Sequence, residues 1–475
     1  MEKDVERFAV LEKNMALFER KYKGFAYWQY LRFGVCEALF GERHEIEKKV
    51  SGKIQINFSK RLLFAVTDIL KDIRFFLLQS RCDLAVFRQA VLKDKFFDFW
   101  QMPEEIKTYS FRAEENINEY LIGEHYFGFP RIKKGLYFRL YKVLKKKIFQ
   151  TSSWNVFDTN ERKFLVELED RLKEQYGQSL SWQEMEEAVI DASITHNIYK
   201  KYFKKVFDKL QCKAILTIVY YQTVLYPAYE AAREKGIKII ELQHGVINNH
   251  ESYWFEDRRG INNYTPDYLL TYGDIHNEWI KLVTDSRAVS VGFPYQEYMI
   301  STLKDIETKS DTVIFYPDSF PEYEDIIDQY IKKYRQYNVL IKLHPLQSGH
   351  IEEYFPVLSK NKDAVFINSQ DKGIYYWLKY AKHHVMASTT VGLEAMAYDH
   401  CNVCIIESVP HEQTQCLLDW GVARGFRTVD ELADLIQNPI EDKPNIQDVR
   451  GMLWKRDAKK NMEEFFQKMF EDGWV

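Results

Sequence analysis

Eight residues with reactive side chains or turn-forming backbones stand directly after apolar runs of the sequence. In chain order they are Gln243, His244, Gly245, His344, Pro345, Ser388, Thr389 and Thr390. The runs before them, "IKIIEL", "NVLIKL" and "HHVMA", have the length and composition of buried strands. Ligands of doubly wound α/β domains bind beyond the carboxyl ends of parallel strands, so these residues are the first candidates for a binding site.

Phosphate binding is the chemistry that these residue types favour. The hydroxyl residues 388–390 lead into an expected helix, whose N-terminal N–H groups attract anions. One hydroxyl is enough to cap a helix, whereas three in a row suit a bound anion. The imidazole of His344 could donate to a phosphate oxygen, and Pro345 would end the strand there. Glu394 lies one helical turn after Thr390, from where its carboxylate could reach ribose hydroxyls.

Strand and helix patterns supply the elements that must position these residues. From Lys213 onward, short apolar runs alternate with helical patterns in two successive series, which is typical of parallel sheets built from βαβ units. The earlier part of the chain predicts mainly helices, including 59–79, with strands at 81–89 and 106–111. The fold class expected is therefore α/β, with two doubly wound Rossmann-type domains, a cleft between them and a helix-rich N-terminal part.

The domain limits that we expect follow from this alternation. The first domain, on the acceptor side, has its Rossmann-like part from about residue 210, and the second domain binds the nucleotide donor. In chain order the expected units are 1–295, 296–440 and a C-terminal helical segment, 441–475.

Composition narrows the classes of protein that the chain can be. It has 475 residues, 46% of them hydrophobic, and a net charge of -4, which indicates a globular protein and argues against nucleic-acid binding. No run approaches the roughly 18 apolar residues of a spanning helix. The charged start "MEKDVERFAVLEKN" differs from a secretory signal, and the six cysteines are scattered, so we expect a cytoplasmic protein.

A basic segment leaves two interpretations open. Residues 131–150 carry eight Lys or Arg and no acid, interleaved with apolar side chains. As a helix this segment would bind the anionic inner surface of a membrane, making the protein peripheral there. It would equally serve as a solvated face over an ordinary core stripe.

Four segments together resemble a known group of enzymes. "ELQHG", "PDYLLTYGDIH", "IKLHP" and "STTVGLEAM" are similar, in this order, to bacterial surface-polysaccharide transferases of the GT-B fold. That group includes capsule glycosyltransferases, sialyl- and Kdo-transferases, and teichoic-acid glycerophosphotransferases, and the resemblance covers residues 213–407. It implies that His344, Ser388 and Thr389 bind the phosphate of a CMP- or CDP-activated donor, with His244 facing the same cleft.

The resemblance does not assign the catalytic base. The acidic motif that sialyltransferases carry in their first domain has no clear counterpart, which leaves His244, Asp274 and Glu241 as candidates. The sequence also contains no D-x-D triplet, the motif with which other transferases hold a divalent ion. We therefore expect a metal-independent reaction without a cofactor.

The function predicted from the sequence is transfer of a sugar from a nucleotide-activated donor to a growing bacterial surface glycan or glycolipid. Three alternatives remain at this point. They are a CDP-glycerol-type glycerophosphotransferase, a nucleotide-sugar 2-epimerase, and a non-catalytic assembly subunit.

Overall fold

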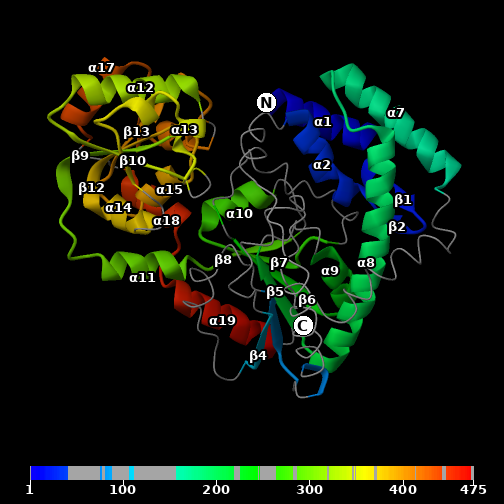
Figure 1. Ribbon diagram of the computed structural model, residues 1–475. Coiled ribbons are helices and arrows are strands. Elements are labelled where there is room, and N and C mark those ends of the chain that lie inside the picture. Colours follow the sequence, from blue (N-terminus) through cyan, green and yellow to red (C-terminus); the bar gives the residue numbers. More distant parts are fainter. Residues whose placement is uncertain are drawn as a thin grey trace, which may run out of the picture.

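The architecture consists of two parallel β-sheets with helices on their faces and a separate group of N-terminal helices (Figure 1). In the computed structural model the described residues are 2–40, 75–77, 81–87, 106–111, 157–218, 225–243, 245, 264–281, 286–317, 320–344, 347, 349–367, 372–411, 413–440 and 445–471. The basic segment 131–150, most of the helix expected at 59–79, His244 and Pro345 lie outside them.

The first sheet has six strands, all parallel, in the order β4-β3-β5-β6-β7-β8. The strands are β3 (Leu84–Phe87), β4 (Thr108–Phe111), β5 (Ala214–Ile218), β6 (Lys238–Leu242), β7 (Tyr268–Thr271) and β8 (Arg287–Ser290). The central strands β5, β6 and β7 are buried almost throughout, as a parallel sheet covered on both faces requires. The two strands expected at 81–89 and 106–111 are confirmed as β3 and β4.

The second sheet also has six parallel strands, in the order β11-β10-β9-β12-β13-β14. They are β9 (Lys309–Tyr316), β10 (Asn338–Lys342), β11 (Val365–Ile367), β12 (Ala381–Met386), β13 (Asn402–Ile406) and β14 (Arg424–Phe426). Counted along the chain this is the 3-2-1-4-5-6 order of dinucleotide-binding folds, and it reverses between β9 and β12.

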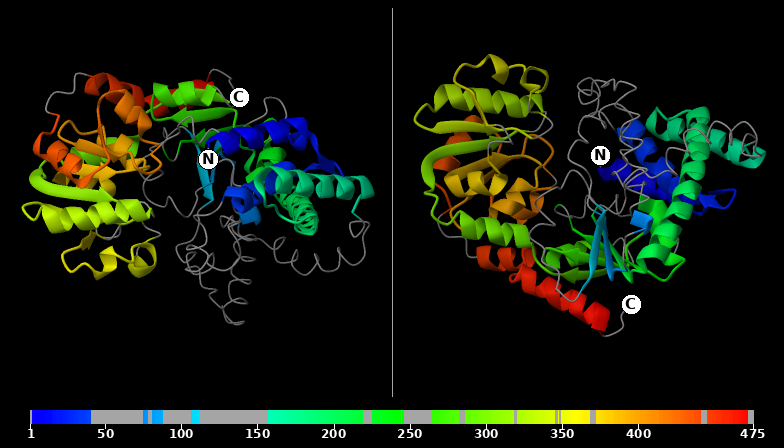
Figure 2. Two further views of the ribbon diagram at one scale, coloured as in Figure 1. Left: turned by 90° about the horizontal axis from the view of Figure 1, so that it is seen from above. Right: turned by 60° about the horizontal axis from the view of Figure 1, so that its bottom comes forward.

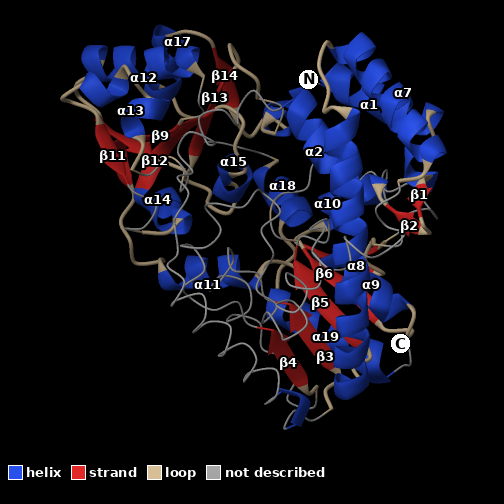
Figure 3. Cartoon of the chain, turned by 45° about the vertical axis from the view of Figure 1, so that its right-hand side comes forward, coloured by secondary structure: helices blue, strands red, loops and turns tan. Residues whose placement is uncertain are grey.

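Helices cover both faces of each sheet, as Figure 3 shows with strands in red and helices in blue. On the first sheet, α8 (Trp182–Leu210) and α9 (Tyr226–Arg233) pack on one face. On the second sheet, one face carries α12 (Pro321–Lys333), η7 (Leu358–Lys360) and α17 (Val429–Gln437). The other face carries α14 (Ile374–Tyr380), α15 (Val391–Ala395), α16 (Gln415–Asp419) and α18 (Ile446–Leu453). The short α13 (Ile351–Tyr354) precedes η7.

The N-terminal helices form a core of their own. They are α1 (Glu2–Asn14), η1 (Leu17–Glu19), α2 (Trp28–Phe40) and α7 (Thr159–Tyr176), with a small hairpin of β1 (Lys21–Tyr22) and β2 (Phe25–Ala26). Their apolar side chains pack with the first half of α8. Glu12 is buried there, and it accepts hydrogen bonds from Trp28 Nε1 at 2.6 Å and from Arg32 Nε at 2.7 Å.

The C-terminal helices join the two sheets. After α18 the chain turns back, and α19 (Ala458–Glu471), red in Figure 2, runs along the first sheet. There Phe465 of α19 contacts Tyr268 of β7. We call α18 and α19 the return segment. It is held near α10 (Asp274–Lys281) and α11 (Pro294–Thr302), and Glu297 of α11 accepts a hydrogen bond from the backbone N–H of Ala458.

These observations confirm the expected fold class of two doubly wound α/β units with a helix-rich N-terminal part. Strand β14, in contrast, was not expected, because its three residues include a glycine and follow no long apolar run. The limits at residues 295 and 440 stay predictions. None of the described helices is both long and apolar enough to cross a bilayer.

Candidate functional site

The hydroxyl residues 388–390 stand where the second sheet reverses its strand order. Strands β9 and β12 are neighbours and end side by side, with Tyr316 opposite Met386. The chain then continues through Ala387 into the hydroxyl residues and α15. Helices leave to opposite faces of the sheet at such a reversal, and doubly wound sheets bind their ligands there. The sequence therefore places its three hydroxyls at the position where doubly wound sheets bind ligands.

Two hydroxyls of this loop accept long hydrogen bonds from backbone N–H groups. All three residues are half-buried. The backbone N–H of Gln413 reaches Ser388 Oγ at 3.4 Å, and that of Val391 reaches Thr389 Oγ1 at 3.4 Å, both at the limit of a hydrogen bond. Thr390 stands at the N-cap of α15 and makes no side-chain cap. N-capping therefore does not explain the hydroxyl of Thr390.

Helix α15 is shorter than the sequence pattern suggested. It spans five residues, so its dipole adds less to anion binding than a full helix would. Its start is nevertheless fixed tightly on the sheet. A Cβ on Gly392 would lie 2.9 Å from Met386 Sδ and from Leu417 Cδ1, so a larger residue there would have to displace these two side-chain ends.

His344 follows β10, the strand on the other side of β9 from β12. Its side chain is exposed, and its backbone is held by Gln347. The N–H of His344 donates to Gln347 Oε1 at 2.8 Å, and Gln347 Nε2 donates to the carbonyl of Pro317 at 3.4 Å. Gln347 thus joins the loop after β10 to the end of β9. Sequence reasoning missed it, because nothing in "HPLQSG" marks a glutamine as a clamp.

Glu394 lies on α15 and faces tyrosines from both sheets. Burial is the main reason why the pKa values of these phenols are raised, and the negative charge of Glu394 raises them further. The phenols are Tyr272, Tyr295, Tyr316 and Tyr375. The carboxylate therefore lies close to the contact between the two sheets.

On the first sheet, Gln243 holds the ends of β6 and β7 together. Its Oε1 accepts from the N–H of Tyr272 at 2.7 Å, and its Nε2 donates to the carbonyl of Gly245 at 2.7 Å. Both ends of the amide are thus occupied by backbone, and the residue is 1% exposed. These bonds fix the backbone at Tyr272 and Gly245, so Gln243 acts on the site by positioning rather than by direct contact.

Asp274 begins α10 directly after β7 and is exposed. Its Oδ1 accepts from the hydroxyl of Ser290, and Asn277 Nδ2 donates to the same hydroxyl oxygen at 2.7 Å. The carboxylate is thereby oriented at the carboxyl edge of the first sheet. Gly273 before it lies against the return segment.

Glu241 lies apart from the other candidates. It is 1% exposed, and the strand alternation puts it on the face opposite Ile240 and Leu242, towards α8 and α9. Its charge acts on Tyr229 of α9, whose pKa is raised chiefly by burial. We infer that a direct role in the crevice suits Asp274 better than Glu241.

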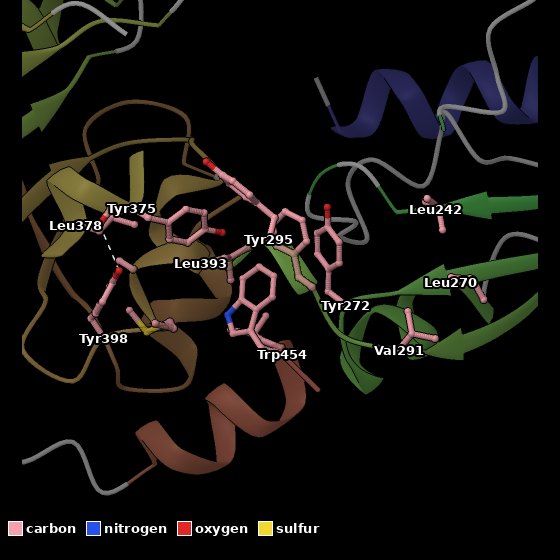
Figure 4. Packing of buried hydrophobic residues seen from close by; sticks show 14 of the residues in the cluster. Leu242, Leu270, Tyr272, Val291, Tyr295, Tyr375, Leu378, Leu393, Tyr398 and Trp454 are labelled. Atoms are coloured by element: carbon pink, nitrogen blue, oxygen red, sulfur yellow. Dashed lines mark hydrogen bonds between the residues drawn. The ribbon is translucent and has the colours of Figure 1, made fainter. Parts of the chain in front are cut away.

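An aromatic seam joins the two sets of residues. The aromatic seam consists of Tyr272, Phe293, Tyr295, Tyr375 and Trp454. Figure 4 labels four of them, Tyr272, Tyr295, Tyr375 and Trp454, packed between the two sheets. Tyr272 stacks on Phe293 with ring centroids 4.3 Å apart and lies 5.4 Å from Trp454, and Tyr295 contacts Tyr375 at 5.8 Å. The seam brings the end of β7 close to α14 and α15. The sequence did not reveal it, because 31 tyrosines give no means of choosing these.

A buried histidine pair lies beneath the hydroxyl loop on β12. Tyr316 Oη lies 3.0 Å from His384 Nδ1, and His384 Nε2 lies 3.0 Å from the carbonyl of Ala381. The carbonyl can only accept, so Nε2 carries the proton and Tyr316 donates to Nδ1. Burial lowers the pKa of the neighbouring His383 to about 4. Both imidazoles are therefore buried structural side chains of β12 and are not available to bind a donor.

Comparison with known proteins gives matches in structure only. No family model and no curated protein matches the sequence. The chain is similar to the UDP-GlcNAc 2-epimerase of Methanocaldococcus jannaschii, with 12% identity, a TM-score of 0.46, and coverage of 82% of this chain and 99% of that one. It is also similar to the UDP-GlcNAc 2-epimerase of Neisseria meningitidis, with 14% identity, a TM-score of 0.45, and coverage of 81% and 99%.

A glycosyltransferase is among the similar structures as well. The glycotransferase of kitacinnamycin matches with 10% identity, a TM-score of 0.38, and coverage of 60% of this chain and 83% of that one. These likenesses concern the fold alone, and the two Rossmann-type sheets are established by the strand order of this chain itself. They assign no activity to this chain. Among the residues that the structure describes, no group of three His, Cys, Asp or Glu could hold a metal ion.

Proposed function

We propose that this protein is a nucleotide-sugar enzyme, and specifically a glycosyltransferase, whose donor binds between the two sheets. The observation that supports this most directly is the position of the hydroxyl loop 388–390 at the strand-order reversal of the second sheet. His344 stands at the end of the next strand but one, and Glu394 lies one turn further along the chain. Hydroxyls, an imidazole and a carboxylate at one sheet edge form a set suited to a phosphorylated sugar.

In this proposal the donor is held by the second sheet. Ser388 and Thr389 donate hydrogen bonds to the phosphate, Thr390 adds a third hydroxyl, and His344 neutralises charge on the departing nucleotide. Glu394 accepts hydrogen bonds from hydroxyls of the donor. A CMP- or CDP-activated donor is favoured because it is the one that the sequence resemblance implies.

The reaction forms one bond and breaks one. An acceptor hydroxyl attacks the anomeric carbon, and the bond from that carbon to the phosphate oxygen breaks with its electron pair leaving on the nucleotide. The acceptor's proton passes to a base of the first domain. Asp274 is the described carboxylate best placed for this, with His244 as the other candidate. A glycerophosphate donor would be attacked at phosphorus instead.

A nucleotide-sugar 2-epimerase is the second candidate. An epimerase needs carboxylates in its crevice, and Asp274 of α10 and Glu394 of α15 could supply one from each domain. Several of the similar solved structures are named as UDP-GlcNAc 2-epimerases. Inversion at C2 breaks the C2–H bond, so an epimerase run in D₂O would place deuterium at C2 without any acceptor. A transferase would leave that position unlabelled.

A screen of nucleotides tests the proposal before any acceptor is known. The chain is mixed with CMP, CDP, UDP or GDP, and its unfolding temperature is recorded. A nucleotide at about 100 times its Kd stabilises a protein by about 2.7 kcal/mol, so the preferred base gives a clear shift. If none of the four nucleotides raises the unfolding temperature, the proposal is contradicted and a non-catalytic assembly subunit is favoured. The glycan or glycolipid acceptor, and membrane binding through 131–150, stay predictions.

A further inference from the structure

Three polar atoms of the aromatic seam are buried without a hydrogen-bond partner. Tyr272 is 4% exposed, Tyr375 1% and Trp454 5%. Among the described residues, none accepts from or donates to Tyr272 Oη, Tyr375 Oη or Trp454 Nε1. Native proteins satisfy the large majority of such atoms, because a buried and unpaired polar group destabilises the fold. Three in one cluster therefore call for a functional reason.

Two of these atoms, the phenol oxygens, belong to residues on which the charge of Glu394 acts. Tyr272 ends at the carboxyl edge of the first sheet, and Tyr375 comes from α14 of the second domain. Glu394 lies near enough to both for its charge to act on their phenols. The amide of Gln296 approaches Tyr375 without meeting hydrogen-bond geometry. The polar groups thus come from both walls, one helical turn beyond the hydroxyl loop.

The chemistry of this group suits a polyhydroxylated ligand. Phenol hydroxyls both donate and accept, a carboxylate accepts from sugar hydroxyls, and flat rings pack against the C–H faces of a sugar. The transferred unit of a donor must also face the first domain, from which the proposed acceptor base comes. Of the phenols that the first domain contributes to the seam, Tyr272 is the one whose hydroxyl has no hydrogen-bond partner among the described residues.

We propose that Tyr272, Tyr375 and Glu394 bind the glycosyl unit of the nucleotide-activated donor. This rests on the proposed function and names the residues that recognise the sugar rather than the nucleotide. The two phenols find their hydrogen-bond partners in sugar hydroxyls. Since both phenols are buried, the domains must part slightly at the aromatic seam to admit the sugar and then close around it.

Removal of single hydroxyls tests this assignment with a matched control. Tyr272→Phe and Tyr375→Phe each delete one unpartnered hydroxyl from the seam. Tyr330→Phe deletes an equally buried, unpartnered hydroxyl from α12, in the cluster on the other face of the second sheet. None of the three changes breaks a hydrogen bond described here, so all three variants should fold and unfold at or above the temperature of the unaltered chain.

Calorimetric titration then separates sugar from nucleotide recognition. The probes are UDP with UDP-N-acetylglucosamine, CDP with CDP-glycerol, and CMP with CMP-N-acetylneuraminic acid. For the pair that binds, we expect the Kd of the complete donor to rise about tenfold in each seam variant, which corresponds to the loss of one hydrogen bond. The Kd of the bare nucleotide should be unchanged. Tyr330→Phe should bind both as the unaltered chain does.

The outcomes distinguish this inference from the proposed function. If both seam variants bind the complete donor with unaltered affinity, the glycosyl assignment is wrong, although the proposed function stands. If they weaken nucleotide and complete donor equally, the phenols contact the nucleotide, which also overturns the assignment. If the unaltered chain binds no probe, the proposed function fails, and this inference fails with it.

Discussion

His344 is the imidazole that we place at the donor phosphate. Its side chain is exposed, while Gln347 holds the backbone through bonds that do not involve the ring. We expect His344→Ala to lower kcat/KM for the donor by about 100-fold, or ~2.7 kcal/mol of transition-state stabilisation, with an unchanged unfolding temperature.

His350 supplies the control for this prediction. It lies on the same connection and contacts Glu353 at 3.3 Å, at the N-cap of the short α13. His350→Ala should leave kcat/KM within about twofold, because the residue has no place in the proposed donor site. Equal turnover by His344→Ala and the unaltered chain would remove His344 from the phosphate site.

For individual residues, the sequence predicted where a side chain lies in the fold better than it predicted what that side chain does. The strand-end placement of Ser388, Thr389 and His344 was predictable, since an apolar run followed by a polar group marks a carboxyl edge. The role of Gln243 was not, because its partners, Tyr272 N and Gly245 O, depend on how β7 aligns with β6. The register between two strands depends on contacts that are distant in the chain, so it cannot be predicted from a single sequence.

Among the elements, a buried polar cluster fastens α2, α8 and α9 together. His196 of α8 is 2% exposed, with Nδ1 2.6 Å from Tyr30 Oη and Nε2 bonded to Glu230 of α9. Lys200 bonds the other oxygen of that carboxylate. Burial opposes ionisation of Glu230, but the bonds from His196 and Lys200 outweigh it and lower the pKa to about 2. The charged form is thus favoured by folding.

This cluster predicts a stability that depends on acidity. A carboxyl whose pKa falls on folding stabilises the native state above its unfolded value, near 4.5, and this stabilisation is lost as the pH falls towards 2. Glu230→Gln should therefore lower the free energy of unfolding by about 2 kcal/mol at pH 7. In urea titrations the difference should narrow between pH 4.5 and 2. A constant difference over this range would mean that the charge is not what stabilises the cluster.

The packing of the N-terminal helices could be predicted only in part. Helical content follows from local periodicity, and the N-cap signals of α7 and α8, Asp158 and Ser181, are readable in the sequence. The joining of α2 to α9 depends instead on Tyr30, His196 and Glu230, which are up to 200 residues apart in the chain. No spacing rule connects them.

For the whole molecule, the return segment decides how the two sheets are joined. The alternating pattern predicted two sheets, but not that α19 would cross back and cover the first. Two glycines make this crossing fit. Gly273 faces the carbonyls of Met452 and Leu453, and Gly292, with φ of +93°, faces the carbonyl of Lys455. Both glycines could be read as turn residues in the sequence, but their contact partners could not.

Gly273→Ala tests the importance of this join. The added Cβ would lie 2.3 Å from the carbonyl oxygen of Met452 and 2.5 Å from Leu453 C, where backbone cannot yield without shifting α18. We expect the free energy of unfolding to fall by about 2–3 kcal/mol, with the return segment cleaved early in limited proteolysis. Gly451→Ala, in α18 itself, meets nothing within 4 Å and should be neutral or stabilise by up to about 1 kcal/mol, because alanine favours helix. If Gly273→Ala resists protease as Gly451→Ala and the unaltered chain do, the close approach at Gly273 is not what fastens the return segment.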